Sequence, residues 1–204
     1  MTEKKRYHHG DLRESLLAEA TTVIAESGVE GLSMRGLAER AGVSRTAAYH
    51  HFRDKNELLC AIAEDGFRNW QKHFHVLLDR TPEDLESWFH QFVQVYIEFA
   101  RDHAQQYDLM FGRAIWKNSQ PTASLKKLST ECFQSYVEFI THWQAQGLIA
   151  DQLDGLRVAQ VTWSTMHGFS RLLNDGIYLE GEAVRSICDS TVKLLISNLE
   201  RASI

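Results

Sequence analysis

The chain has 204 residues, of which 44% are hydrophobic and 24% are charged, and its formal net charge is −5. This length suits one small and one larger domain with a sizeable buried core. It holds no long uncharged apolar run of the kind that crosses a membrane, and its start, MTEKKRYHHG, does not resemble a signal peptide, so we expect a soluble cytoplasmic protein.

The first predicted helix runs from about residue 11 to residue 27, and Gly28 ends it. Leu12, Leu16, Ala20, Val23 and Ile24 form its apolar face at helical spacing. We expect this face to pack against the helices that follow.

A tight turn between two short helices is predicted within residues 31–59, GLSMRGLAERAGVSRTAAYHHFRDKNELL. Ser33 suits the N-cap of the first short helix, and Gly42 can adopt the left-handed conformation that ends it. Ser44 can then cap the second helix. Two helices with this spacing are typical of a helix-turn-helix, which places its second helix in the DNA major groove.

The second helix of this motif, residues 45–52, has an apolar side and a polar side. Ala48 and Phe52 point inward at i, i+4, which leaves the polar side to solvent. Arginine can pair with guanine or phosphate, threonine can contact the thymine methyl group, and tyrosine and histidine can donate to phosphate oxygens. The candidate DNA-binding residues are Arg35, Ser44, Arg45, Thr46, Tyr49, His50 and Lys55.

Lys55 enters this set because it lies in the first turn of the next helix. Asp54 and Glu57 have the spacing of a capping box, with Asp54 as the N-cap. The Lys55 ammonium and the free backbone N–H groups of that turn could together hold a phosphate.

This stretch resembles the DNA-binding domain of the TetR/AcrR family of bacterial transcriptional regulators. The resemblance is carried by Gly31 to Arg35, Leu37-Ala38, Ala41 to Ser44, Tyr49 to Phe52, Lys55 and Leu58-Leu59. It implies an all-α chain of about nine helices. Residues 1–60 would form the helix-turn-helix DNA-binding domain, and residues 61–204 a larger ligand-sensing and dimerisation domain.

Charge is unevenly distributed along the chain. Residues 1–60 carry nine basic and nine acidic residues, so the whole net charge of −5 lies in the remainder. Because residues 1–60 are formally neutral, we expect weak non-specific binding to DNA and dependence on a specific operator. We also expect the affinity for DNA to fall as the salt concentration rises. For the basic arm Lys4-Lys5-Arg6 two interpretations stay open, contact with DNA or disorder without a role.

The rest of the chain reads as helical throughout, without strand alternation or repeats. Predicted helices span about 54–78, 82–102, one or two between 106 and 116, 121–146, 154–175 and 182–201. Pro82 and Pro121 suit the first position of their helices, and Gly147 ends the longest one. The cysteines, Cys60, Cys132 and Cys188, are odd in number and widely spaced, so we expect reduced core thiols.

Family resemblance implies a homodimer built on the last two helices as a four-helix bundle. The predicted interface residues are Phe169, Leu173, Val184, Ile187, Thr191 and Leu195. Their apolar stripe agrees with that role, although a wholly intrachain core is the alternative. Two recognition helices related by a two-fold axis would read a pseudo-palindromic operator.

The second domain is rich in aromatic residues, among which polar groups are interspersed. Pockets between bundle helices are typically apolar with a few polar anchors, so we expect a hydrophobic or aromatic small-molecule effector. The candidate effector residues are Trp70, Trp88, Phe92, Tyr96, Phe111, Trp163 and His167, each of which could instead belong to the core. Trp163, His167 and Gly168 also resemble the Trp-His-Gly signature that names one C-terminal branch of the family.

Other functional classes fit the chain less well. It has no GxSxG, GxxxxGK[ST], HExxH or paired CxxC motif, so we expect neither an enzyme nor a cofactor site. A metal-sensing regulator is disfavoured because histidine and cysteine pairs at i, i+4 are missing. An architectural DNA-binding protein would not need the large aromatic domain. We therefore expect a repressor that leaves its operator when the effector binds. The operator sequence, the effector, the regulated genes and the direction of regulation stay open.

Overall fold

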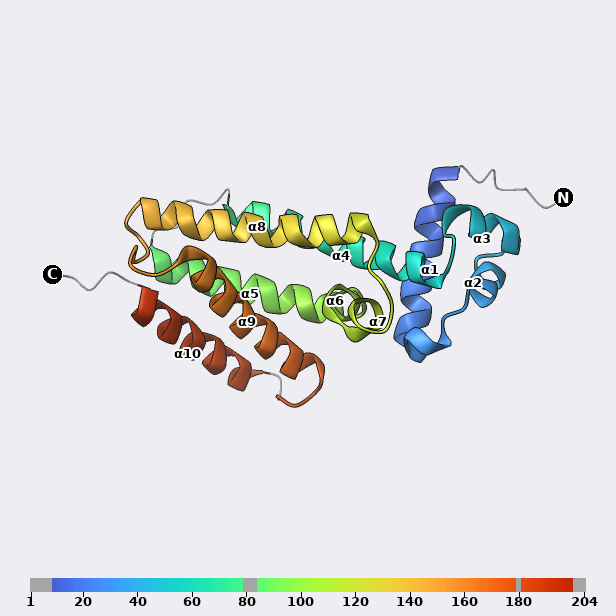
Figure 1. The fold of residues 1–204 in the computed structure, drawn as a ribbon. Helices are drawn as coiled ribbons and strands as arrows, with labels where there is room; N and C mark the ends of the chain where they lie inside the picture. Colours follow the sequence, from blue (N-terminus) through green and yellow to red (C-terminus); the bar gives the residue numbers. More distant parts are fainter. Residues whose placement is uncertain (1–8, 79–83, 179–180, 200–204) are drawn as a thin grey trace. The chain divides into compact units, whose positions relative to one another are not determined.

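The computed structural model describes residues 9–78, 84–178 and 181–199. All regular secondary structure in these ranges is helical, which confirms the predicted all-α class. The described residues form ten helical segments, of which α7 is a single turn, so the nine longer helices agree with the predicted number. Figure 1 shows how these helices are arranged within the chain. None of the described helices is long and apolar enough to cross a membrane.

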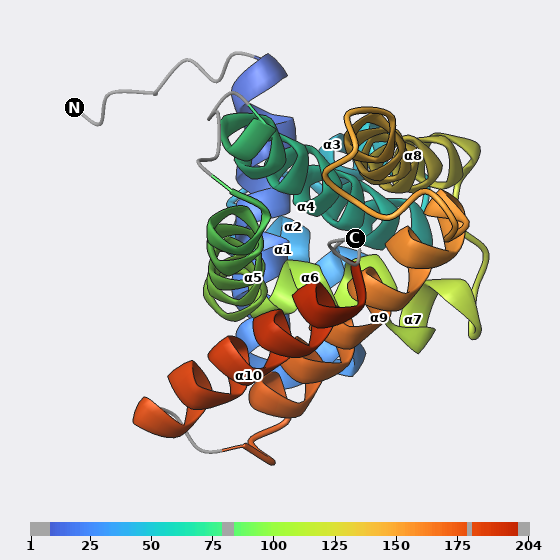
Figure 2. The same ribbon diagram turned by 90° about the vertical axis from the view of Figure 1, so that its left-hand side faces the viewer.

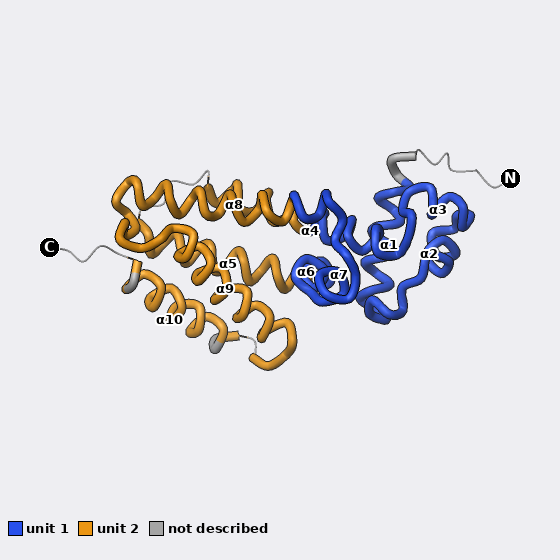
Figure 3. The backbone as a smooth tube through the Cα atoms, viewed as in Figure 1, with its two compact units in different colours: residues 1–66, 105–127 blue, residues 67–104, 128–204 orange. Residues whose placement is uncertain are grey.

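The chain divides into two compact units that do not follow a single cut after residue 60 (Figure 3). Unit 1 comprises residues 1–66 and 105–127, and unit 2 comprises residues 67–104 and 128–204. The predicted domains, residues 1–60 and 61–204, differ from these units because the chain returns to unit 1 after residue 104, and one boundary in the sequence cannot describe a unit made of two segments.

Unit 1 holds the helix-turn-helix and the segments that return to it. Its elements are α1 (His9–Gly31), α2 (Met34–Arg40), α3 (Arg45–His51), the first part of α4 (Lys55–Leu78), most of α6 (Ala104–Phe111), α7 (Arg113–Trp116) and the start of α8 (Ala123–Ala145). The predicted apolar face of α1 is buried throughout, and α1 packs against α2 as expected. Gly28 interrupts α1 with a φ of 69°, so the predicted break falls at the right residue although helical turns resume beyond it.

Unit 2 is a helical bundle. It contains the remainder of α4 and α8 together with α5 (Leu85–Asp102), α9 (Gly155–Asn174) and α10 (Glu182–Leu199). Helix α5 packs against both α9 and α10 (Figure 2). As predicted from its broad apolar surface, α5 is central, with nine of its side chains buried.

Some predicted boundaries shift by a few residues. Helix α8 begins at Ala123 rather than at Pro121, because Thr122 is the residue whose hydroxyl accepts the Leu125 N–H at 3.2 Å. Gly147 ends the helix with a φ of 76°, as predicted. Pro82 and the basic arm at residues 4–6 lie outside the described residues.

The cysteines are all free. Cys60 and Cys132 are buried, as expected for core thiols, whereas Cys188 is only partly buried. Burial raises the pKa of the Cys132 thiol to about 12 and also raises the pKa of Cys60. Both buried sulfurs are therefore protonated at neutral pH and poor nucleophiles.

Candidate nucleic-acid interface, effector site and dimer surface

The turn between α2 and α3 is built by capping interactions. The Ser33 hydroxyl accepts the Gly36 N–H at 3.1 Å and begins α2. At its other end the Gly42 N–H donates to the Glu39 carbonyl at 3.2 Å and the Val43 N–H donates to the Ala38 carbonyl at 3.0 Å. This is a Schellman ending, and it needs the φ of 66° that Gly42 adopts. These bonds set the direction in which the chain enters α3.

Helix α3 presents one side to the core and the other to solvent. Ala48 is fully buried, and Phe52, which ends the helix, is 1% exposed. The Arg13 guanidinium lies over the Phe52 ring, 5.2 Å from its centroid, so α1 holds the end of α3 through a cation–π contact that the sequence pattern did not reveal.

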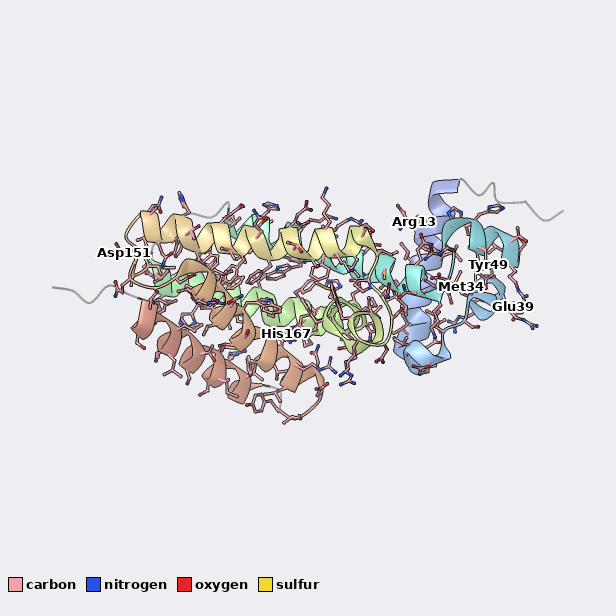
Figure 4. The ribbon with its side chains drawn as sticks, in the orientation of Figure 1. Arg13, Met34, Glu39, Tyr49, Asp151 and His167 are labelled. Carbon is pink, nitrogen blue, oxygen red and sulfur yellow. The ribbon has the colours of Figure 1, made fainter. Side chains whose placement is uncertain are left out.

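The predicted base-reading residues share the solvent side of α3. Arg45, Thr46, Tyr49 and His50 are all exposed, and 46% of the Tyr49 surface is accessible. Figure 4 shows the Tyr49 side chain on α3. In the part of the chain that the structure describes, Arg45 forms no ion pair, so its guanidinium can pair with a guanine or phosphate without first breaking one.

Ser44 has a structural role at this surface. Its Oγ accepts the Ala47 N–H at 3.1 Å and caps α3. A capping hydroxyl still has its own hydrogen to donate, so Ser44 could hold the helix end and donate to a phosphate at the same time.

Arg35 and Lys55 differ in how available they are for phosphate contact. The Arg35 Nε donates to the Glu39 carboxylate at 2.9 Å, and this bond raises the pKa of the arginine. Phosphate would have to replace Glu39, an exchange that costs little between exposed partners. Lys55, by contrast, is the first residue of α4 and has no ion pair among the described residues.

The capping box ahead of α4 is confirmed in a slightly altered form. Asp54 accepts the Glu57 N–H at 2.8 Å, and this backbone bond lowers the pKa of Asp54. The Glu57 carboxylate reaches back to the N–H of Arg53, one residue earlier than the N-cap, at 2.7 Å. Both charged groups help to order the turn that carries Lys55.

Other basic residues near the motif stabilise the unit itself. Arg40 binds Glu19 through Nε at 2.5 Å and Glu26 through Nη1 at 2.6 Å, which ties α2 to α1. These hydrogen bonds raise the pKa of Arg40 further. Two of the α1 glutamates that offset the basic charge of residues 1–60 therefore bind Arg40 of α2 and not the residues of α3.

Four of the predicted effector residues lie together in an aromatic core of unit 2. Trp88, Phe92 and Tyr96 are buried on α5, and the Trp70 ring of α4 meets the Tyr96 ring edge-on with centroids 5.0 Å apart. Helix α8 closes the cluster, since Phe139 stacks on Trp88 at 4.1 Å. We call the rings of Trp70, Phe74, Trp88, Phe92, Tyr96, Tyr136, Phe139 and Trp143 the aromatic core.

The other three predicted effector residues lie apart from this core. Phe111 belongs to unit 1, where its ring packs on Tyr107 at 5.0 Å, because the chain has left unit 2 before α6. Trp163 and His167 stack on each other along α9 at 5.3 Å, and burial, aided by Arg171, lowers the pKa of His167. The predicted set therefore does not form one cluster.

Polar atoms inside the aromatic core differ in how they are satisfied. The Tyr136 hydroxyl lies 2.7 Å from Thr162 Oγ1, which itself donates to the Val158 carbonyl, so Tyr136 is the donor of that pair. Burial raises the pKa of Tyr136 well above its ordinary value. Trp88 Nε1 is buried and has no acceptor among the described residues. An unpaired buried N–H is costly, which makes Trp88 the donor that a bound molecule could satisfy.

Two of the predicted interface residues, both partly exposed, line a groove. The groove has a volume of about 630 Å³ and runs between α5 and α10, with Leu173 and Val184 in its walls. His90 and Asp189, whose side chains are 3.6 Å apart, lie on its opposite sides. Phe169 is buried, while Ile187, Thr191 and Leu195 are partly exposed.

Helices α9 and α10 each expose an apolar residue that was not in the predicted interface. Val161 on α9 is 61% exposed and Leu194 on α10 is 68% exposed. Gly168 lies on α9 with open space where a Cβ would be. Which residues of a helix are exposed depends on how that helix is rotated about its axis in the bundle. A continuous apolar stripe in the sequence does not determine this rotation.

Comparison with known proteins places both parts of the chain in one family. Residues 16–62 match the family described as bacterial regulatory proteins, tetR family, and residues 89–198 match the tetracyclin repressor-like C-terminal domain.

The described residues contain no group of three or more histidine, cysteine, aspartate or glutamate side chains arranged to hold a metal ion.

Individual relatives agree with these family matches. A structure from Rhodococcus sp. RHA1, of a protein with unknown function, has a TM-score of 0.84 and 31% identity over 97% of this chain and all of its own. The HTH-type transcriptional activator FasR of Mycolicibacterium smegmatis is 26% identical, with 74% of each chain covered. The class C tetracycline repressor protein of Escherichia coli is 35% identical over 45% of this chain and 44% of its own. The chain is therefore a member of the TetR family of bacterial transcriptional regulators.

Proposed function

We propose that this regulator binds a pseudo-palindromic operator as a homodimer and represses transcription until a hydrophobic or aromatic small molecule releases it. The observation that carries the DNA-binding part is the exposed side of α3, where Arg45, Thr46, Tyr49 and His50 stand next to one another. Arg45 and Thr46 would read base edges, and Tyr49 and His50 would donate to phosphates. Arg35, Ser44 and Lys55 would add phosphate contacts around them.

A dimer is supported by the exposed apolar residues of α9 and α10. Val161 and Leu194 would be removed from water at such an interface, and Gly168 would let the partner's backbone approach closely. Of the originally predicted residues, Leu173, Val184, Ile187, Thr191 and Leu195 are partly exposed and could contribute to the interface, whereas Phe169 is buried within the protomer.

Effector binding is supported by the aromatic core of unit 2. The Trp88 N–H would be satisfied by an oxygen of the effector, and the surrounding rings favour a flat apolar body. Trp163, His167 and Gly168 keep their resemblance to the Trp-His-Gly branch, and their stacked arrangement on α9 makes them a second candidate contact. Repression is the direction that we propose, although the relatives include one named as an activator.

The function is tested by selecting bound sequences from random duplex DNA with the purified chain. We expect enrichment of one pseudo-palindrome whose half-sites are about one helical turn apart, and an affinity that falls steeply with salt. Recovery of unrelated sequences with no footprint would indicate an architectural DNA binder. An affinity that stays constant between low and moderate salt would contradict phosphate contact by the α3 surface.

A further inference from the structure

Glu64 is a buried carboxylate that the DNA-binding surface does not use. It lies in unit 1 on α4 and is only 7% exposed. Its Oε1 accepts the Ser124 hydroxyl at 2.5 Å and the Thr122 hydroxyl at 3.3 Å. These two donors come from the segment that begins α8, about sixty residues further along the chain.

Glu64 is one of three residues on a single stripe of α4 that hold this segment. Asn56, Cys60 and Glu64 follow one another at i, i+4 and i+8, so they share one side of the helix. The Asn56 amide donates to the Gln120 carbonyl at 2.8 Å and its oxygen accepts the Ser119 hydroxyl at 2.6 Å.

Cys60 lies between these two contact points. Its sulfur is 4.0 Å from the Gln120 carbonyl oxygen and fully buried. We call the three α4 residues Asn56, Cys60 and Glu64, with residues 119–124, the clasp.

The clasp also determines where α8 starts. The Thr122 hydroxyl that donates to Glu64 accepts the Leu125 N–H at 3.2 Å, which makes Thr122 the N-cap of α8. Leu125 itself is fully buried. Loss of the Glu64 carboxylate would therefore disturb the first turn of α8 as well as its attachment to α4.

Both clasped helices continue into the other unit. Helix α4 passes from unit 1 to unit 2 after residue 66, and α8 does so after residue 127, so the Glu64–Ser124 contact of the clasp lies within a few residues of both crossings (Figure 3). A continuous α-helix is stiff over a few turns, because each residue is hydrogen-bonded to the next turn. Two helices fastened at one end can transmit a displacement together that one helix would partly lose by bending.

We infer that Glu64 is a positioning residue that makes the first turns of α4 and α8 move as one body, so that a displacement of either helix within unit 2 reaches the DNA-binding unit. This role rests on the proposed effector response, whereas the clasp contacts themselves do not. A buried carboxylate is a poor choice for packing alone, since its desolvation must be offset by hydrogen bonds.

The test measures the distance between the units directly, without operator or effector. Spin labels are placed on cysteines introduced at the exposed positions Glu30 in unit 1 and Glu98 in unit 2. Cys188 is changed to serine, and the labelled chain is diluted with unlabelled chain so that distances within one protomer dominate. Pulsed electron double resonance then reports the width of the distance distribution.

We expect a narrow distribution for the parent chain and at least a two-fold broadening for both Glu64→Ala and Ser124→Ala. Glu64→Gln should restore the narrow distribution, because its amide oxygen still accepts the two hydroxyl hydrogens. A role in stability alone would lower the melting temperature without broadening the distribution of the folded chain.

Ser135→Ala is the matched control, because among the described residues the Ser135 hydroxyl bonds only to the Glu131 carbonyl of its own helix. Distributions of equal width in the parent chain, Ser124→Ala and Ser135→Ala would overturn the inference. Should Glu64→Ala not fold, Ser124→Ala alone decides. Because neither DNA nor effector is present, failure here would leave the proposed operator binding to be judged on its own experiment.

Discussion

At the scale of single residues, the side chains of α3 that could contact DNA are different from those that pack in the core. Arg45 and Tyr49 are exposed side chains next to the buried Ala48, so changing them should affect binding and spare the fold. We expect Arg45→Ala to weaken operator affinity by roughly 5- to 150-fold, corresponding to ~1–3 kcal/mol for a lost base contact. Tyr49→Phe should lose less, since one phosphate hydrogen bond is removed. Fluorescence anisotropy with the selected operator gives the affinities, and unchanged far-UV circular dichroism is the control.

Gly42 should show the opposite behaviour. A Cβ at this position would meet nothing within 4 Å, so the cost of substitution comes from the φ of 66° alone. Gly42→Val should destabilise the fold by ~1–3 kcal/mol because a β-branched residue resists positive φ, and Gly42→Ala by about 1 kcal/mol. Urea denaturation measures both. Equal stabilities of the alanine and valine variants would contradict a backbone origin.

His167 predicts a dependence of stability on pH. Burial lowers its pKa in the folded chain below the ordinary value of 6.5, so at mildly acid pH the unfolded chain binds the proton more readily. The free energy of unfolding should therefore fall as pH drops below about 6.5, towards the lowered folded pKa. His167→Gln should reduce this loss between pH 7 and pH 5. Denaturation curves across that range decide the point, and parallel curves for both proteins would refute it.

At the scale of elements, the helices were predicted well because each carries its own signals. Ser33, Gly42 and Ser44 begin and end helices through atoms within a few residues, and their capping bonds are found as expected. The start of α8 was misplaced by two residues because Pro121 and Thr122 are both acceptable near a helix start. Contacts with α4, distant in the sequence, accompany the start at Ala123.

Helices α9 and α10 carry the dimer prediction. Gly168→Leu should leave the protomer folded, because open space surrounds the glycine, and should shift the protein towards monomer by obstructing the partner. Val161→Glu should do the same by placing a charge in the interface. Analytical ultracentrifugation measures the state of association.

Val76→Glu provides a matched control on α4, since that valine is 53% exposed and lies away from α9 and α10 in the sequence. A Gly168→Leu protein that stays dimeric would rule out this part of α9 as the interface. If Val76→Glu alone dissociated the dimer, the interface would have to be sought on α4.

At the scale of the whole molecule, the proposed effector response is tested through Trp88. Trp88→Phe keeps an aromatic ring and removes the unpaired N–H, so we expect nearly unchanged thermal stability but a loss of response to aromatic ketones. Naphthalene and 2-acetylnaphthalene form a suitable probe pair that differs in one acetyl group. The ketone should raise the melting temperature of the parent chain more than the hydrocarbon does, and should release it from the operator.

Trp143→Phe is the control for this experiment, because Trp143 packs against Trp88 within the same core. It should retain the preference for the ketone. Probes that stabilise the fold without changing operator affinity would refute the sensor function, and an equal response to both probes would refute the role of the Trp88 N–H.

The sequence by itself determined what is local in this protein. Helix order, the turn at Gly42, the capping of α3 and the polar identity of its outer side all follow from residues less than one or two turns apart, and the structure contains each of them. The family could also be predicted from the sequence, because the residues that form and surround the helix-turn-helix lie within about thirty consecutive positions.

Only the tertiary structure decided which distant residues meet. Phe111 belongs to unit 1 and not to the aromatic core of unit 2, because the chain returns to unit 1 after residue 104, and Leu173 and Val184 line a groove together with residues of α5. The clasp joins Glu64 to Ser124 across sixty residues of sequence. Helical periodicity shows which residues share a face, but the rotation of each helix depends on how all of them pack together, and that is a property of the folded chain as a whole.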